Sequence, residues 1–144
     1  MTATTQDRNT PNKNVTKRRA HPVAANEVIP AGVGVGVKSG YAVNAQDAAG
    51  VKTVGVSIEG VDNTGGGDGD KFVVVHADGD HEFASVGLAK TDLGLKAYWA
   101  DNQTVLPSAG LASGSNAILA GEFAEIISAT RAILDIDDAV KTGS

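Results

Sequence analysis

The chain has 144 residues, of which 42% are hydrophobic, and a formal net charge of −5 at pH 7; this length suits one domain with its own hydrophobic core. It contains no cysteine, which excludes disulfide bonds and thiolate metal sites. No apolar run approaches the roughly 18 residues that a membrane helix needs. The polar N-terminus also lacks the apolar core of a secretory signal, so we expect neither a membrane partner nor such a signal.

Charge is distributed unevenly along the chain. Residues 1–26 carry five Lys and Arg side chains against one carboxylate, a net charge of +4, which leaves −9 for the remainder. This segment is rich in Thr and Asn and shows no apolar periodicity. We interpret 1–26 as an extended basic arm that is disordered in isolation and becomes ordered on a partner. The alternative is a terminus without a role.

The stretch AGVGVGVKSG, residues 31–40, predicts a β-strand. Valines and glycines alternate, so one face of the strand is apolar and the other is bare. A bare face implies that a second strand or a neighbouring subunit packs closely against it. A phosphate-binding loop would need a glycine before Lys38, where the sequence has Val37. The alternating residues are Val33, Val35 and Val37 on one face and Gly32, Gly34 and Gly36 on the other.

The next segments continue the β pattern. Val54, Val56 and Ile58 are predicted to share one side of a strand, and a glycine-rich loop follows. The stretch KFVVVHADGDHEFASV, residues 71–86, predicts a β-hairpin that turns at Asp78–Gly79.

The C-terminal half of the chain is also predicted to consist of β-strands. Strands are expected at 95–99 and 104–106, and a closing pair of strands within 124–136. A helix over 124–134 is disfavoured because β-branched residues and nearby glycine suit it poorly. We therefore expect an all-β fold, a small β-barrel or β-sandwich-like domain with an extended N-terminal arm. Its divisions are the arm at 1–26, a β-rich domain at 27–137 and a frayed C-terminal tail at 138–144.

The sequence shows no catalytic constellation, and we expect neither enzymatic activity nor a cofactor. Only three histidines are present, and none stands in a recognisable nucleophile context. The stretch HADGDHEF offers possible metal ligands but lacks the spacing of a calcium loop. A solvated hairpin tip is the simpler interpretation. The alternative is a carbohydrate- or metal-binding β-module that uses the loops at 62–71 and 76–82.

The basic arm could neutralise nucleic-acid phosphates. However, the remainder of the chain is strongly acidic, and aromatic residues, which stack on bases, make up only 4% of the chain. We therefore expect no direct nucleic-acid partner. An acidic protein surface, or another copy of the chain, fits the arm better.

Five stretches of the body, taken in order, resemble the capsid decoration (cement) proteins of tailed-phage heads, of the capsid-fibre type. The resemblance covers about 27–136, and its most telling piece is AYWADNQTV at 97–105. The stretches are EVIPAGVGVGVKSGYAV, AAGVKTVGVSIEGV, GDKFVVVHADGDHEF, GLKAYWADNQTV and AILAGEFAEI with RAILDI.

The resemblance implies a non-enzymatic virion protein on the outer capsid surface, where it binds the major capsid protein and stabilises the shell. It also implies a homo-oligomer, for which we expect a trimer, while a dimer or monomer stays open. In this interpretation, the capsid-binding residues are the arm cations Arg8, Lys13, Lys17, Arg18 and Arg19, of which the last three give the highest local charge. The subunit-packing residues are Gly32, Gly34 and Gly36, and no metal or catalytic residue is expected.

Overall fold

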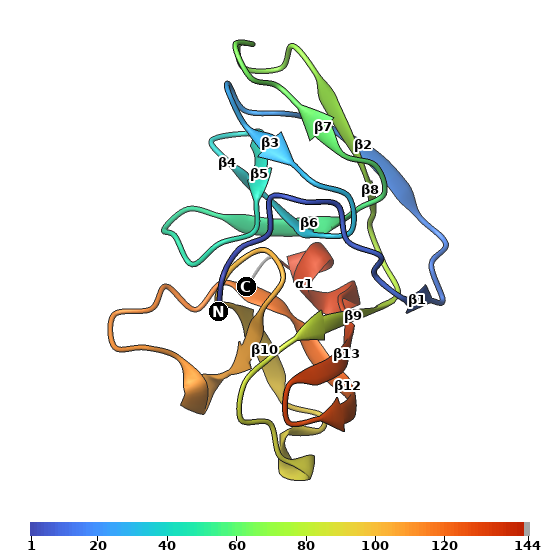
Figure 1. Cartoon of the computed structure of the whole chain (residues 1–144), viewed down its shortest axis with the longest axis vertical. Coiled ribbons are helices and arrows are strands. Elements are labelled where there is room, and N and C mark those ends of the chain that lie inside the picture. The colour runs from blue at the N-terminus through green and yellow to red at the C-terminus, as the bar shows by residue number, and fades with distance from the viewer. Residues whose placement is uncertain (143–144) are drawn as a thin grey trace.

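Antiparallel strands dominate the computed structural model, which describes residues 1–142. The strands form two principal sheets, one of five and one of six strands, stacked along the long axis of the molecule (Figure 1). This arrangement confirms the expected all-β class. Among residues 1–142, no helix combines the length and apolar character that crossing a bilayer requires.

The five-stranded sheet holds a core of small aliphatic side chains. A parallel bridge between Val23 and Ala42 joins its two outer strands, so the sheet curls round and closes on itself. Its strands, in spatial order, are β2 (Arg18–Pro22), β8 (Phe72–His76), β6 (Lys52–Ser57), β4 (Gly34–Lys38) and β5 (Tyr41–Asn44). Its buried core consists of Val23, Ile29, Val33, Val35, Ala42, Val73 and Val75. A short pair, β3 (Val28–Ile29) with β7 (Val61–Asp62), lies beside it.

The six-stranded sheet encloses larger side chains, with Trp99, Phe83 and Phe123 at its centre. Its strands, in spatial order, are β1 (Asn12–Lys13), β9 (Asp80–Ala84), β13 (Arg131–Asp135), β12 (Leu119–Ser128), β10 (Lys96–Trp99) and β11 (Val105–Pro107). A parallel bridge between Ala84, at the end of β9, and Thr104, directly before β11, closes this sheet, and only the short β1 lies outside the closure. Two single turns of 3-10 helix, η1 (Lys90–Asp92) and η2 (Ser108–Gly110), lie in its loops.

The predicted hairpin at 71–86 is wrong. Both strands exist, but β8 pairs with β2 and β6, whereas β9 pairs with β1 and β13. Asp78–Gly79 is therefore the point at which the chain crosses from one sheet to the other. The physical reason is that the strands serve different cores: Val73 and Val75 enter the aliphatic core, and Phe83 enters the aromatic one.

A bulge also corrects the predicted face of the strand at Val54–Ile58. The pairing of β4 with β6 shifts register, so Val35 faces Gly55 while Gly36 faces Thr53. Such an extra residue reverses the side on which the following side chains lie. Val54 consequently packs on the aliphatic core, and Val56 joins the aromatic one.

The N-terminal residues differ from the expected separate arm. β1 pairs with β9 and β2 pairs with β8, so residues 12–22 run antiparallel to residues 72–81 along both sheets. We call residues 12–22 the N-terminal ribbon. Its backbone hydrogen bonds incorporate it into the two sheets, which the composition of the segment did not indicate.

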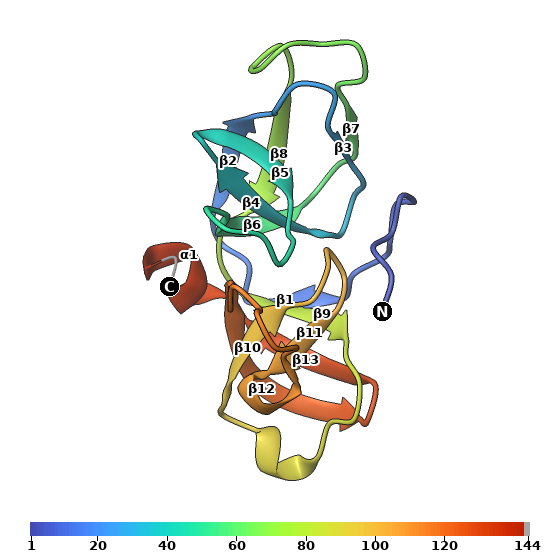
Figure 2. The same ribbon diagram turned by 90° about the vertical axis from the view of Figure 1, so that its left-hand side faces the viewer.

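The C-terminal residues also differ from the expected frayed tail. Residues Asp137–Thr142 form the helix α1, which contacts β6 of one sheet and β12 of the other. Ala139 is fully buried there, and Val140 packs on the aromatic core. Figure 2 shows α1 and the N-terminus flanking the junction of the two sheets from opposite sides. The remainder of the predicted tail, 143–144, lies outside the described residues.

Trp99 joins the two sheets. Its ring meets Phe83 edge to face at a centroid distance of 5.1 Å. Its Nε1 donates a hydrogen bond of 3.0 Å to the hydroxyl of Thr53 in β6. That hydroxyl donates in turn to the carbonyl of Leu119 in β12, at 2.6 Å. The buried indole thus has a partner for its polar group, and the chain of hydrogen bonds links the two sheets.

Candidate functional site

The cations of the N-terminal ribbon are held on a rigid support. At the turn between β1 and β2, the Asp78 carboxylate accepts hydrogen bonds from the backbone N–H of Thr16 (2.9 Å) and Lys17 (3.0 Å), and from the Thr16 hydroxyl. Partial burial by itself would raise the pKa of Asp78, but these hydrogen bonds and the Lys17 charge lower it below its ordinary value. The ionised carboxylate therefore anchors the ribbon where the chain crosses between the sheets.

The crossing also joins the ribbon to the C-terminal helix. A side chain at Gly79, whose φ is +94°, would collide with Val15 and with backbone of the ribbon. The Gly79 N–H donates to the Asp137 carboxylate at 2.8 Å, and the Gly79 carbonyl accepts from the Ile136 N–H at 3.1 Å. The N-terminal ribbon and the start of the C-terminal helix are thereby fixed against the same turn.

Three cations line one groove at this point. Lys17 and Arg19 from the ribbon and Lys141 from α1 border a groove of about 300 Å³, whose walls also include Asp78 and Asp137. Both carboxylates already accept backbone hydrogen bonds. Lys141 was missed by the sequence analysis because its segment was expected to fray. The signal available was its position four residues after Asp137, in the last turn of a short helix.

Arg18 lies on the other side of the ribbon. Successive side chains of a strand point to opposite faces, so Arg18 borders a second groove, of about 330 Å³, with Thr16 and His76. Burial, followed by the Arg18 charge, lowers the pKa of His76. The three adjacent cations expected to act as one patch are therefore divided between two grooves, and Lys17 borders both.

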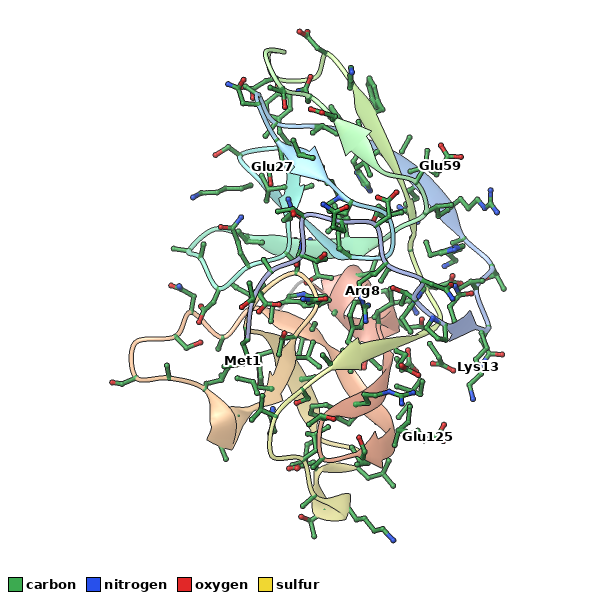
Figure 3. All side chains as sticks on the ribbon, in the orientation of Figure 1. Met1, Arg8, Lys13, Glu27, Glu59 and Glu125 are labelled. Carbon is green, nitrogen blue, oxygen red and sulfur yellow. The ribbon has the colours of Figure 1, made fainter. Side chains whose placement is uncertain are left out.

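Arg8 serves the fold of its own chain, which corrects its expected place among exposed arm cations. Its guanidinium donates to the Thr10 hydroxyl (2.9 Å) and to the Glu82 carbonyl (3.1 Å), and lies 5.0 Å above the Phe83 ring. Burial lowers the pKa of Arg8, and the Glu82 charge opposes that change. Figure 3 shows Arg8 in the middle of the molecule, whereas Lys13 lies at its periphery. The Lys13 side chain is 62% exposed and makes a single long ion pair, 4.0 Å from Glu125.

The three glycines expected to pack against another subunit are buried within the chain itself. A side chain at Gly34 would overlap the Trp99 indole, and one at Gly36 would overlap Val51. Gly32 precedes the strand, has a φ of +77° and lies against the backbone of Arg8. The close approach deduced from the bare face is real, but other residues of the same chain occupy it, among them the Trp99 ring of the other sheet at Gly34. These glycines are not available to a neighbouring subunit in this fold.

The glycine-rich loop at 62–71 uses its carboxylates for backbone hydrogen bonds, two within the loop and one to the segment after β2. Asp62 accepts from the N–H of Thr64 (2.9 Å), and Asp68 accepts from that of Ala25 (2.8 Å). Asp70 accepts from the N–H of Gly67 at 2.8 Å. Each carboxylate thus replaces a backbone hydrogen bond in an irregular segment.

The stretch at 76–82 is a crossing between sheets rather than an open loop tip. His81 is fully buried, and its Nε2 donates to the Asp78 carbonyl at 2.9 Å. The His76 and His81 rings lie 5.7 Å apart, tilted against each other. Within the described part of the chain, no three His, Asp or Glu side chains converge in a way that could hold a metal ion.

Comparisons of the chain with protein-family models, with curated proteins and with solved structures find no match. The functional interpretation therefore depends on the residues and geometry described above.

Proposed function

We propose that this protein is a non-enzymatic structural component of a phage virion, which binds the major capsid protein on the outside of the assembled capsid and stabilises the shell. The observation that carries the proposal is the placement of exposed cations on a ribbon shared by both sheets. Lys17, Arg19 and Lys141 form the proposed contact, with Arg18 on the adjoining face. The sequence resemblance described above supplies the identity of the partner.

The physical argument concerns the cost of ordering the binding groups. A mobile arm would lose conformational entropy when it docks. Here the backbone of residues 12–22 is already paired with β8 and β9, and Asp78 holds the turn between. Only the cation side chains remain to be ordered. A preorganised basic face on a chain with a net charge of −5 also favours one orientation on an acidic surface.

Many weak contacts suffice for such a role, because a shell presents repeated sites. Linked copies raise the effective concentration of each contact, so modest individual affinities give firm attachment. We propose a homo-oligomer for this reason. The resemblance implies three copies, and measurement of the mass in solution distinguishes a trimer from a dimer or monomer.

The decisive experiment mixes the purified protein with expanded phage shells that lack it and measures how much protein sediments with them. We expect attachment at micromolar concentration that weakens as salt rises, because exposed charge pairs are screened. A Lys17→Ala/Arg19→Ala/Lys141→Ala variant should bind less.

The matched control is Lys38→Ala/Lys52→Ala/Lys96→Ala, which removes the same charge from exposed positions outside the grooves. It should bind like the unmodified chain. Failure of the unmodified protein to sediment with any shell would contradict the proposed function. Equal losses for both variants would contradict the assigned contact.

A further inference from the structure

A second candidate site lies on the Arg18 side of the N-terminal ribbon, which Figure 1 shows running along one side of the molecule from β1 to β2. Arg18 and His76 are directly opposed in the pairing of β2 with β8, so their side chains project from the same face of the sheet. The groove beside them has a volume of about 330 Å³, and we call it the Arg18 groove. It is bordered by Val15, Thr16, Lys17, Arg18 and His76.

The Arg18 groove has no carboxylate among its lining residues in the described chain, unlike the groove on the opposite face of the ribbon. In that other groove, Asp78 and Asp137 lie beside the cations and balance part of their charge. The residues around the Arg18 groove are cationic, neutral or apolar. A negatively charged ligand in this groove is therefore attracted by the cations that border it and meets no carboxylate at the wall.

The hydrogen-bond donors of this groove also lack protein acceptors. Within residues 1–142, the Arg18 guanidinium makes neither an ion pair nor a hydrogen bond, whereas Arg131 pairs with Glu82 at 3.1 Å. The ring nitrogens of His76 likewise make no hydrogen bond within these residues, and neither is sealed from solvent. Two donor side chains that share one opening are thus free to bind the same ligand.

A neighbouring groove carries the same sign of charge beyond His76. His76 also borders a groove of about 180 Å³ with Arg8, Asn9 and Asn12, and no Asp or Glu of the described residues lines it. All three hydrogen bonds of the Arg8 guanidinium come from Nη1, so Nη2 and Nε have no acceptor in the described part of the chain. His76 therefore stands between two grooves that each contain a guanidinium group.

We propose that the Arg18 groove is a binding site for a tetrahedral oxyanion with two negative charges, a phosphate or sulfate group, held by Arg18, Lys17 and His76. Guanidinium groups bind such anions through paired N–H donors, and these charge-assisted hydrogen bonds are stronger than neutral ones. The four oxygens of a tetrahedral anion can accept from the ribbon and from β8 at once, whereas a carboxylate accepts in a single plane. The inference does not depend on the proposed capsid role, which rests on the groove at the opposite face of the ribbon.

His76 gives the site a signature that attraction to surface cations in general would lack. Burial and the Arg18 charge lower the pKa of His76, and the Asp78 charge opposes them. A bound dianion favours the protonated ring, so binding should tighten as the pH falls. The charged and titratable groups around His76 are Arg18 from β2, Asp78 from the crossing, His81 from β9 and Arg8 across the neighbouring groove.

The experiment titrates the isotope-labelled full chain with sodium sulfate and follows the backbone amide resonances, while sodium chloride keeps the ionic strength constant. Sulfate is the probe because its charge does not change over the pH range used. We expect saturable shifts at millimolar concentrations, confined to residues that line the two grooves, and tighter binding at about pH 5.5 than at about pH 7.5. Arg18→Gln should weaken binding about tenfold or more. His76→Gln should remove the dependence on pH.

Arg19→Gln is the matched control, because it removes the same charge from the adjacent residue, which borders the other groove. It should bind sulfate like the unmodified chain, and thermal unfolding verifies that each variant is folded. Shifts that do not saturate, equal losses for Arg18→Gln and Arg19→Gln, or a pH dependence that survives His76→Gln would each overturn the inference. None of these outcomes bears on sedimentation with shells.

Inorganic phosphate and a simple phosphate monoester distinguish the sources of the anion. Both should shift the same amides as sulfate, and failure of both to do so would contradict a site for tetrahedral oxyanions. Tighter binding of the monoester than of inorganic phosphate would support a phosphate group carried by a larger molecule. Equal or weaker binding of the monoester would support the free ion.

Discussion

The two closed sheets have the same kind of topology but are stabilised differently. The aliphatic core of the five-stranded sheet is built from Val, Ile and Ala, whereas the six-stranded sheet is packed around one Trp and two Phe side chains. Large aromatic groups bury more apolar area per residue. The N-terminal ribbon contributes the five-residue strand β2 to the five-stranded sheet and only the two-residue strand β1 to the six-stranded sheet. Most of the paired ribbon thus belongs to the half with the smaller core side chains, so the order of β2 and the integrity of that half depend on each other.

The largest effect is expected from Trp99→Ala, which removes the centre of the aromatic core and its hydrogen bond to Thr53. Truncation of a buried aromatic side chain costs about 3–5 kcal/mol in the free energy of unfolding. Denaturant unfolding followed by circular dichroism measures the loss. Because Trp99 also contacts β4 and β6, both sheets should unfold together. A loss under about 1 kcal/mol would contradict the central role of the indole.

Gly34→Ala tests the contact between the sheets from the other side. The new methyl group would overlap the rigid Trp99 ring, so we expect a loss of about 1–3 kcal/mol in unfolding free energy. Gly67→Ala is the matched control, because the nearest atom to its added methyl group lies at an ordinary contact distance of 3.6 Å. Equal stabilities of the two variants would show that the junction tolerates added volume.

Asp78→Ala should weaken the attachment of the ribbon to the two sheets. It removes the acceptor for the N–H groups of Thr16 and Lys17, and we expect a loss of about 1–2 kcal/mol. Hydrogen exchange should accelerate in residues 12–22 and 72–76 and change less in β12 and β13. Uniform acceleration across both sheets would contradict the difference in stability proposed between them.

The smallest effect is a dependence of stability on pH. Burial lowers the pKa of His21, His76 and His81, and the neighbouring Arg19 and Arg18 charges also lower those of His21 and His76, respectively. Above the unfolded-state pKa of about 6.5, these histidines are neutral in both states and contribute no pH dependence. As the pH falls below that value, the unfolded chain binds protons first, so the free energy of unfolding decreases until the folded-state pKa values are passed.

Denaturant midpoints measured between pH 7.5 and pH 5 examine this dependence. His81→Gln, at the buried crossing, should reduce the slope, whereas a slope unchanged by this substitution would exclude His81 as a contributor. Two of the three histidines, His21 and His76, belong to the five-stranded sheet. Loss of exchange protection at mildly acidic pH should therefore appear first in that sheet.

For the basic residues, the sequence predicted where the positive charge lies along the chain but not how it is arranged in space. Composition alone identified residues 1–26 as the basic part of the chain. The alternation of side chains along β2 then divided Arg18 from Arg19, and the fold brought Lys141 beside Lys17 and Arg19. Arg8 looked equivalent to the other cations in the sequence, but packing placed it over Phe83. The spacing of the charges in the sequence could not predict the groove, nor that Arg8 lies outside it.

The sequence by itself determined the all-β class, most of the strands and the close approach on the glycine face, because alternation and turn composition act over a few residues. The tertiary structure alone decided which strands pair. β8 and β9 are consecutive strands joined by a segment whose composition favours a tight turn, yet they do not pair with each other. β8 pairs with β2 and β6, and β9 pairs with β1 and β13, because the two strands belong to different cores. The bulge at Val54 has the same origin, since it depends on pairing between residues far apart in the chain. The helix at Asp137–Thr142 has a local signal in the helical spacing of Asp137 and Lys141, but its contacts with β6 and β12 join distant parts of the chain.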